Sequence, residues 1–361
     1  MLGKDLDYIL LTISLTFVFT ALIMPLMIKI ANKIGAIDEP RTRHIHKKNM
    51  PKLGGLGIFL GFLFGYIIFG INSIQMNSVL IGSFIIILTG IIDDISPLRA
   101  REKLLGQICA ALVIIFYGQI LLKNVTAFGY NINFGIFAYP VTLIFIVSCI
   151  NMINLIDGLD GLSGGISSIF FITIGIICYF QGKLDTLTAS ITFIMLGATL
   201  GFLLHNFYPA KIFAGDTGSM FMGFIISIIA LLGFKGTTLT SLIVPILVLA
   251  IPILDTLFAI IIRMIKWNPI FSADKEHMHH QLLNMNFSQR TTVLIVYAID
   301  ILFSLASIFY VLKDRVKGGI IYIILFILVS WFVLNTSIIS EKVSCKVKKI
   351  ENKIIKTKKD N

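Results

Sequence analysis

Long apolar runs separated by short polar segments make up most of the chain. Many runs are about 17 to 25 residues long, the length that an α-helix needs to cross roughly 30 Å of hydrocarbon. We therefore expect an all-α polytopic membrane protein with about 10–11 transmembrane helices. The expected spans are residues 8–30, 54–71, 77–92, 104–122, 138–156, 163–181, 187–206, 218–234, 240–264, 293–312 and 318–340.

Composition supports a membrane protein and excludes an ordinary soluble domain. Hydrophobic residues make up 57% of the 361 residues, charged residues 14%, and the mean hydropathy is +0.92. Such a balance is foreign to soluble globular domains. We expect one membrane-embedded catalytic domain over residues 1–340 and a basic cytoplasmic tail over residues 341–361. The four cysteines lack CxxC spacing, so neither a disulfide framework nor a zinc site is indicated.

Positive residues predict the orientation in the membrane. They follow the first and third spans and fill the C-terminal tail, and such segments usually face the cytoplasm. The net charge of +11 is thus explained by anionic lipid and topology rather than by nucleic acid. We expect a multi-pass plasma-membrane protein with its N-terminus outside. The loop after the tenth span disagrees, because it carries Lys313, Arg315 and Lys317.

Carboxylates and amides collect at span ends that this topology places on the cytoplasmic face. A carboxylate near the bilayer centre costs on the order of 2.5 to 3.5 kcal/mol, so such groups are functional candidates. Their common location predicts one convergent site, although polar helix ends that simply meet water are the plain alternative. The candidates are Asp93, Asp94, Asn151, Asn154, Asp157, Asp160 and Asp216.

The segment that closes the fifth expected span has a regular polar pattern. Steps of three residues from Asn151 to Asn154, Asp157 and Asp160 predict one stripe along a helix. The glycines at positions 158 and 161 would permit a tight turn after it. A small hairpin is expected elsewhere, in the outward-facing residues 124–137.

The carboxylates predict a divalent cation. Asp93 and Asp94 are adjacent and repel each other unless a cation or basic groups compensate. Magnesium takes one or two carboxylates together with water and substrate phosphates, and manganese is the alternative. Asp216 lies in a glycine-rich turn at an expected helix start, where backbone amides can hold phosphate oxygens.

Two cytoplasmic loops supply further candidates. His277, His279 and His280 are interpreted as phosphate contacts, with zinc ligation as the alternative. In the first loop Arg43, His46 and Lys47 are phosphate candidates, although positive-inside topology explains part of this cluster. Phe213 offers an aromatic face for a nucleobase. Carboxylates, a magnesium ion and basic groups together indicate phosphoryl transfer, and the membrane setting implies a lipid substrate.

These motifs occur in the order and topology of a known superfamily. The chain resembles the polyprenyl-phosphate N-acetylhexosamine-1-phosphate transferases of glycosyltransferase family 4, in particular the bacterial undecaprenyl-phosphate GlcNAc-1-phosphate transferases. The likeness extends from the first span to at least residue 283. It rests on Asp38-Glu-Pro40-x-x-Arg43-x-x-His46, Pro51-x-x-Gly54-Gly55, Asp93-Asp94, Asn151-xx-Asn154-xx-Asp157-Gly-Leu-Asp160-Gly, Phe213-Ala-Gly-Asp216-Thr-Gly-Ser and His277-Met-His279-His280.

The resemblance implies that undecaprenyl phosphate attacks UDP-N-acetylglucosamine, giving lipid-linked GlcNAc-pyrophosphate and UMP for a teichoic acid, O-antigen or capsule-type glycan. It also implies the residue roles and, plausibly, a homodimer. Asp94, Asp216 and Asn154 would serve magnesium; Asp93, Asp94 and Asp157 would be catalytic. Substrate binding would fall to Arg43, His46, Lys47, Asn151, Asp160, Phe213, His277, His279 and His280.

Three other functions compete with this interpretation. The phospho-N-acetylmuramoyl-pentapeptide transferases of peptidoglycan synthesis typically show consecutive histidines followed by Phe-Glu, which this chain lacks. Intramembrane prenyltransferases also use aspartates and magnesium, but Asp93-Asp94-Ile-Ser lacks the later aspartate of a DDxxD motif. Transporters bind near the membrane midplane, whereas the polar groups here lie at one face.

Overall fold

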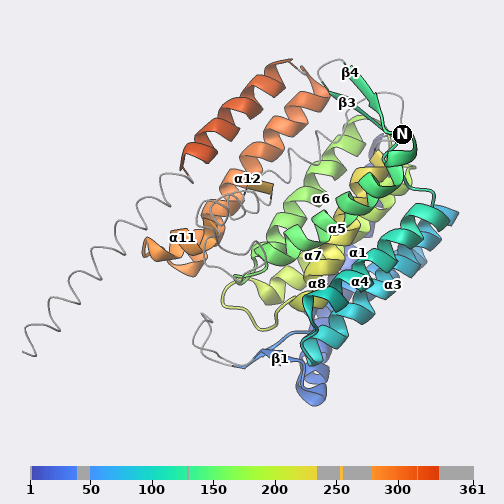
Figure 1. Cartoon of the computed structure of the whole chain (residues 1–361). Coiled ribbons are helices and arrows are strands. Elements are labelled where there is room, and N and C mark those ends of the chain that lie inside the picture. Colours follow the sequence, from blue (N-terminus) through green and yellow to red (C-terminus); the bar gives the residue numbers. More distant parts are fainter. Residues whose placement is uncertain are drawn as a thin grey trace, which may run out of the picture.

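The computed structural model describes residues 2–38, 49–127, 130–233, 253–254, 278–314 and 316–332. Figure 1 shows a bundle of long helices with two small β-hairpins at opposite ends. The helices are α1 (Leu2–Ile34), α2 (Gly54–Phe69), α3 (Ile74–Ile95), α4 (Ala100–Leu112), α5 (Ala138–Ile156), α6 (Leu162–Phe180), α7 (Leu187–Asn206), α8 (Gly215–Gly233), α11 (Met278–Asn284), α12 (Gln289–Leu312) and a further helix over Val316–Phe332.

The polytopic helical fold predicted from the apolar runs is confirmed. In the described part of the chain, 7 helices are long and apolar enough to cross a membrane: α1, α3, α5, α6, α7, α8 and α12. The helices α2 and Val316–Phe332 are shorter apolar helices. The span expected at 104–122 corresponds to α4, which continues as a π-helix over Val113–Tyr117. The expected span 240–264 and the tail 341–361 lie outside the described residues.

Side-chain caps mark where several helices begin. Inside a bilayer no water is present to bind backbone amides, so a spanning segment must form its backbone hydrogen bonds within the helix. The N–H groups of the first turn have no partner within the helix and need an acceptor from outside it. The hydroxyls of Ser73, Thr186 and Ser288 accept the amide three residues later, at 3.0, 3.2 and 3.1 Å. These caps begin α3, α7 and α12.

Small residues allow α1 and α7 to pack closely. A Cβ on Gly197 would lie 2.6 Å from the carbonyl oxygen of Ile13, and one on Gly201 would lie 2.6 Å from that of Phe17. The two glycines are one turn apart, which is the small-xxx-small spacing of close helix contacts in membranes. The hydrophobic effect does not favour contact between helices within lipid, so van der Waals packing along this seam holds α1 against α7.

The centre of the bundle is α8. Almost all of its residues are buried, and it contacts α2, α3 and α5 along its length. Its N-terminus at Gly215 reaches one end of the bundle, where α3 and α5 end and α4 and α6 begin. Sequence motifs that are far apart along the chain are therefore brought together at this end.

The two hairpins distinguish the ends of the bundle. β1 (Ile37–Asp38) pairs with β2 (Met50–Pro51) at the end where α8 begins. β3 (Asn124–Ala127) pairs antiparallel with β4 (Tyr130–Asn133) at the other end, near the N-terminus (Figure 1). The hairpin expected within residues 124–137 is thus confirmed.

Candidate active site

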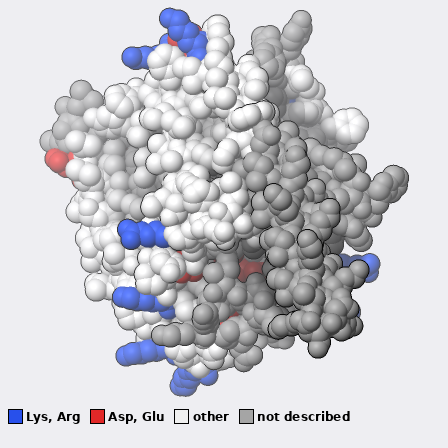
Figure 2. Space-filling view, turned by 90° about the vertical axis from the view of Figure 1, so that its left-hand side faces the viewer, with Lys and Arg blue, Asp and Glu red and all other residues white. Residues whose placement is uncertain are grey.

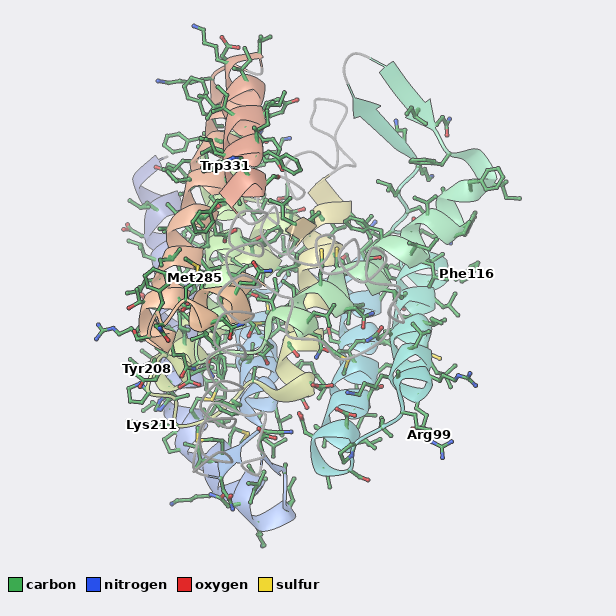
Figure 3. The ribbon with its side chains drawn as sticks, turned by 60° about the vertical axis from the view of Figure 1, so that its left-hand side comes forward. Arg99, Phe116, Tyr208, Lys211, Met285 and Trp331 are labelled. Carbon is green, nitrogen blue, oxygen red and sulfur yellow. The ribbon has the colours of Figure 1, made fainter. Side chains whose placement is uncertain are left out.

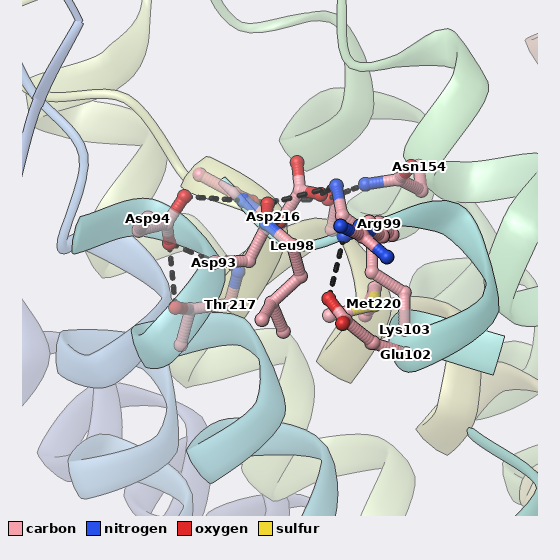
Figure 4. Close-up of polar contacts among 12 residues, drawn as sticks. Asp93, Asp94, Leu98, Arg99, Glu102, Lys103, Asn154, Asp216, Thr217 and Met220 are labelled. Carbon is pink, nitrogen blue, oxygen red and sulfur yellow. Dashed lines mark hydrogen bonds and ion pairs between the residues drawn. The ribbon is translucent and has the colours of Figure 1, made fainter. Parts of the chain in front are cut away.

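Carboxylates from α3 and α8 converge at the β1–β2 end of the bundle. Asp93, Asp94 and Asp216 each offer an oxygen, and these oxygens all lie within 4.8 Å of one another. Figure 4 shows the three side chains between the end of α3, the start of α4 and the start of α8. The convergence predicted from the topology is confirmed for these residues. We refer to Asp93, Asp94 and Asp216 as the acidic cluster.

Asp94 caps the N-terminus of α8. Its Oδ1 accepts the amide of Asp216 at 2.9 Å, and its Oδ2 accepts the amide and the hydroxyl of Thr217 at 3.1 and 2.6 Å (Figure 4). A carboxylate at this position satisfies amides that the helix leaves free and meets the positive end of its dipole. These two amides were expected to hold a phosphate; in the structure they bind Asp94 instead.

Gly215 makes this close approach possible. Its φ of +69° lies in the left-handed region, and a Cβ would stand 2.4 Å from Oδ2 of Asp94. Any other residue would be strained there and would displace the Asp94 carboxylate. The glycine before Asp216 is therefore required by the contact between α3 and α8.

Lys103 lies between two members of the acidic cluster. Its Nζ is 2.8 Å from Oδ2 of Asp93 and also forms an ion pair with Asp216. Lys103 is one of the positive residues after the third span, which were interpreted from sequence only as signals of topology. The available signal was its place at the end of the first turn of a helix that starts six residues after Asp94.

A tight turn brings Lys103 back to the cluster. The second oxygen of Asp93 accepts the amide of Leu98 at 2.7 Å, which closes the turn after α3. Glu102 then accepts the amide of Arg99 at 2.8 Å and begins α4. Because α4 starts so soon after α3, Lys103 at the end of its first turn faces the carboxylates that end α3.

Asn154 joins the cluster from α5. Its Nδ2 donates to Oγ of Ser219 on α8 at 2.8 Å, and its amide also interacts with the Asp216 carboxylate. The expectation that the end of α5 meets the other two motifs is confirmed at this residue. The neutral amide can orient Asp216 without adding charge to the cluster.

The predicted stripe from Asn151 to Asp160 is wrong beyond Asn154. The helix α5 ends at Ile156, and Asp157 is its C-terminal cap with ψ of 57°. Gly161 has a φ of +82°, so the chain turns sharply before α6. The glycines that were expected to permit a turn end the helix before the stripe is complete. Asp157 and Asp160 therefore lie in a loop.

Asp157 is held in a half-buried position at the start of α6. The hydroxyl of Ser163 donates to its Oδ1 at 2.5 Å. Burial, together with the charges of Asp216 and Asp160, raises the pKa of Asp157 to about 7, against the hydrogen bond from Ser163. This carboxyl therefore titrates near neutral pH, where a proton can be taken up or released.

Hydrogen bonds to α7, to the segment after it and to α12 hold the loop between α5 and α6 in place. Asp160 accepts the amide of Ala210 at 3.0 Å, and the hydroxyl of Tyr297 on α12 donates to the carbonyl of Gly161 at 2.5 Å. Asn206 accepts the amide of Gly161 at 3.0 Å. These bonds tie Asp157 to α7 and α12 and keep it at the same end as the acidic cluster.

Asn151 and Phe213 engage the protein in ways that were not expected. Asn151 pairs with the buried side chain of Gln107 on α4, at 2.7 and 3.3 Å. Phe213 lies before α8, where its amide donates to Pro51 at 2.8 Å and its carbonyl accepts from Gly54 at 3.0 Å. Substrate contact by Asn151 and by Phe213 stays a prediction.

The remaining candidates are in or beside residues that are not described. Arg43, His46, Lys47 and His277 lie outside the described residues. His279 and His280 belong to α11, but their side chains are outside what the structure describes.

Positive residues surround this end of the bundle. Figure 3 shows Arg99 and Lys211 low on opposite sides of it, whereas Phe116 and Trp331 lie farther up and point outwards. Figure 2 shows basic side chains over the lower part of one face and at its very top, separated by a broad band that is largely free of them. This pattern suits an apolar belt with charged ends.

The donor set fits a hard divalent cation. Three carboxylates supply oxygen atoms close enough to share one ion, and carboxylate oxygen is the ligand that magnesium and manganese prefer. Lys103 already neutralises part of this charge. The cluster could therefore hold a cation, and an anion could then bind next to it.

Comparisons with known proteins identify the family of the chain. Residues 76–234 match the family described as Glycosyl transferase family 4. The chain is 40% identical over 347 residues to a "Probable undecaprenyl-phosphate N-acetylglucosaminyl 1-phosphate transferase" of Bacillus subtilis, covering 95% of this chain and 96% of the relative. It is 34% identical over 301 residues to a "Decaprenyl-phosphate N-acetylglucosaminephosphotransferase" of Mycobacterium tuberculosis, covering 74% of each.

A third relative comes from another group of bacteria. An "Undecaprenyl-phosphate alpha-N-acetylglucosaminyl 1-phosphate transferase" of Escherichia coli is 28% identical over 299 residues, covering 80% of each chain. The matched family region contains the acidic cluster, Lys103 and Asn154. The fold and the nearly full-length likeness lead to one conclusion: the chain is a multi-pass membrane protein that belongs to glycosyl transferase family 4.

Proposed function

We propose that the chain transfers N-acetylglucosamine-1-phosphate from UDP-N-acetylglucosamine to undecaprenyl phosphate. An oxygen of the lipid phosphate forms a bond to the β-phosphorus of the donor. The bond from that phosphorus to the oxygen bridging the α-phosphate breaks, and UMP leaves with this oxygen. The product is undecaprenyl-pyrophosphoryl-GlcNAc, which starts a lipid-linked glycan of the cell envelope. The near full-length relative carries this activity in its name.

The observation that carries the proposal is the acidic cluster with Lys103 at one end of an apolar helix bundle. The reaction brings together a water-soluble nucleotide and a lipid whose phosphate lies at the membrane surface. A site formed by helix ends can meet both, because one side opens to water and the other to lipid. Carboxylates alone would repel two phosphorylated substrates, so this arrangement requires the positive groups found beside them.

The residues of the cluster have separate tasks. Lys103 neutralises a substrate phosphate and orients it, since its ammonium is a mobile point charge. Asn154 and Ser219 fix the orientation of Asp216. Asp94 holds the start of α8 in place. Magnesium would be held by Asp216 and Asp93 with Asp94 behind them, and would supply charge neutralisation for the diphosphate.

Asp93 lies where it can orient the lipid phosphate. It is linked to Asp216 through Lys103, so an incoming phosphate would compete for the same ammonium group. A polyprenyl phosphate is largely ionised at neutral pH, because the second pKa of a phosphate monoester is about 6. A strong base is therefore not needed, and positioning is the main contribution expected of Asp93. Asp157 orients the nucleotide.

We place this site on the cytoplasmic face of the plasma membrane. Lys33 lies in the last turn of α1, and Arg99 and Arg101 follow α3, at the same end of the bundle as the acidic cluster. Positive residues next to spans favour the cytoplasmic side. UDP-sugars are made in the cytoplasm, which fits this orientation. Neither the relatives nor the described part of the chain supports the homodimer expected from the resemblance.

The test uses purified full-length protein with magnesium and undecaprenyl phosphate. UMP release and the lipid product are measured with UDP-GlcNAc, UDP-GalNAc and UDP-MurNAc-pentapeptide. We expect UMP and lipid-linked sugar with UDP-GlcNAc, and loss of both in Lys103→Ala and Asp94→Asn. The Asn77→Ala variant is the control, because Asn77 lies at the opposite end of α3. Product with UDP-MurNAc-pentapeptide alone, or no UMP with any donor, would refute the proposal.

A further inference from the structure

Two amide side chains form a reciprocal pair inside the bundle. The Nδ2 of Asn151 donates to Oε1 of Gln107 at 2.7 Å, and the Nε2 of Gln107 donates back to Oδ1 of Asn151 at 3.3 Å. Gln107 is 2% exposed and Asn151 is half-buried, so the Gln107 side of the pair is shielded from water. We call Gln107 and Asn151 the amide clasp. It joins α4 to α5.

The amide clasp is saturated by protein partners. The second hydrogen of the Asn151 amide goes to the carbonyl of Val147 at 2.8 Å, and the Gln107 amide also approaches Sδ of Met220 on α8 at 3.5 Å. Both Asn151 hydrogens and its oxygen are therefore in use. A residue that bound substrate directly would have to break these bonds first.

Each residue of this layer lies one turn from a residue of the site. Gln107 follows Lys103 on α4, Asn151 precedes Asn154 on α5, and Met220 follows Asp216 on α8. Residues three or four apart on a helix lie on the same face. The clasp is therefore a second layer directly beneath the site, and it joins the same three helices that supply the site residues.

Rotation of a helix about its axis would move the site residues. Apolar contacts resist separation of two helices but only weakly resist rotation, whereas paired amides have fixed directions. Breaking the pair leaves a buried donor and acceptor without partners, which is unfavourable in an apolar interior. The clasp thus fixes the rotation of α4 relative to α5, and with it the distance from Lys103 to Asn154.

We propose that Gln107 and Asn151 are positioning residues for the transfer reaction, acting through Lys103 and Asn154. This inference rests on the proposed function. It replaces the expectation that Asn151 contacts substrate. Misplacement of catalytic groups by about 1 Å can cost on the order of 100-fold in rate. A positioning role predicts loss of kcat with little change in KM, because the groups that touch substrate are still present.

The test compares Gln107→Ala, Asn151→Ala and the double variant in the full-length protein. We expect each single variant to lose about tenfold in kcat, and the double variant to lose about tenfold as well, because the first substitution already breaks the pair. The KM for UDP-GlcNAc should change by less than about twofold. Losses that multiply to about 100-fold, or a raised KM in Asn151→Ala alone, would overturn the proposal.

A swapped pair separates hydrogen bonding from packing. Gln107→Asn combined with Asn151→Gln keeps two amides and the same total side-chain length. We expect this variant to recover to within about threefold of the wild-type kcat. A swapped pair as slow as the double alanine variant, with a wild-type unfolding temperature, would contradict the clasp. Gln75→Ala and Asn77→Ala, at the far end of α3, are matched controls.

A readout without turnover distinguishes this inference from the proposed function. The unfolding temperatures of the wild type, both single variants and the double variant form a cycle that reports coupling between Gln107 and Asn151. Coupling without UMP release by the wild type would refute the proposed function and leave the clasp intact. UMP release without any coupling in stability or in kcat would refute the clasp alone.

Discussion

Asp94 on α3 and Asp300 on α12 are both buried aspartates within membrane-spanning helices, with 5% and 0% exposed surface. Their surroundings differ. Asp94 accepts three hydrogen bonds from the start of α8, whereas neither oxygen of Asp300 has a hydrogen-bond partner in the described part of the chain. Ser304 and Thr292 on α12 also have unpartnered hydroxyls there.

The difference shows that burial of a carboxylate does not by itself indicate its role. The partners of Asp94 belong to a motif from another part of the chain, and its carboxylate determines where Asp216 lies. Among the described residues Asp300 has no such partner, and a buried polar group without one is unfavourable. The same substitution at the two positions should therefore have opposite consequences.

The largest effect is expected from Asp94→Ala. The first amides of α8 lose their acceptor, and Asp216 moves with them, so activity should fall about 10³-fold or more. The unfolding temperature should also fall, because hydrogen bonds to a charged group contribute about 1.5 to 3 kcal/mol each. Asp300→Ala is the matched control, with UMP release within about threefold of wild type. Equal losses of activity in both variants would remove the distinction between the two aspartates.

The next effect is expected from Lys103→Met. This change keeps the length of the side chain but removes the charge shared by Asp93 and Asp216, so UMP release should fall about 100-fold. Lys211→Met removes an exposed charge at the same end of the bundle. We expect it to change the rate of UMP release by less than about twofold, because substitutions of exposed surface residues usually have small effects. If both variants lose activity alike, the general positive field rather than the specific ion pair is responsible.

A smaller effect in the opposite direction is expected from Asp300→Leu. Removing an unpartnered buried carboxyl should stabilise the protein by about 1 to 3 kcal/mol, visible as a rise of a few degrees in the unfolding temperature. Catalysis should be unchanged. Thermal unfolding in one detergent at pH 7 provides the measurement. A lower unfolding temperature would show that Asp300 has a stabilising partner.

The smallest effect concerns pH and Asp157. Its pKa is about 7 in the folded protein and near 3.9 when unfolded, so the folded state binds the additional proton between these values. The stability contribution of protonated Asp157 is complete below about pH 4 and is lost as the pH rises through about 7. Asp157→Asn should therefore match wild type at about pH 4 and unfold a few degrees higher at pH 8. A constant difference between the two proteins across this range would contradict the raised pKa.

Much of the fold follows from simple patterns in the sequence. Long apolar runs predict spanning helices because a helix satisfies its own backbone in lipid, and alternation around a glycine predicts the β3–β4 hairpin. The acidic cluster could also be predicted, because positive residues place the ends of α3 and α5 and the start of α8 on one side. Topology alone brings these three helix ends together.

Other features depend on three-dimensional contacts. The role of Asp94 as a cap could not be predicted, because the amides it binds lie more than a hundred residues away along the chain. Lys103 was missed because positive charge near a span has a sufficient explanation in topology. The wrong prediction of a polar stripe after Asn154 has a different cause. The three-residue spacing was read as one helix through Asp160, whereas α5 already ends at Ile156, before Gly158.

The close seam between α1 and α7 has a consequence for biogenesis. The α1 helix ends at Ile34 and α7 begins at Leu187, so roughly 150 residues are synthesised before these helices can meet. At about 5 to 20 residues per second, α1 waits in the bilayer for roughly 8 to 30 s without the partner that contains Gly197 and Gly201. During this interval α1 is accessible to membrane chaperones and proteases, and its seam residues are a place where quality control can act.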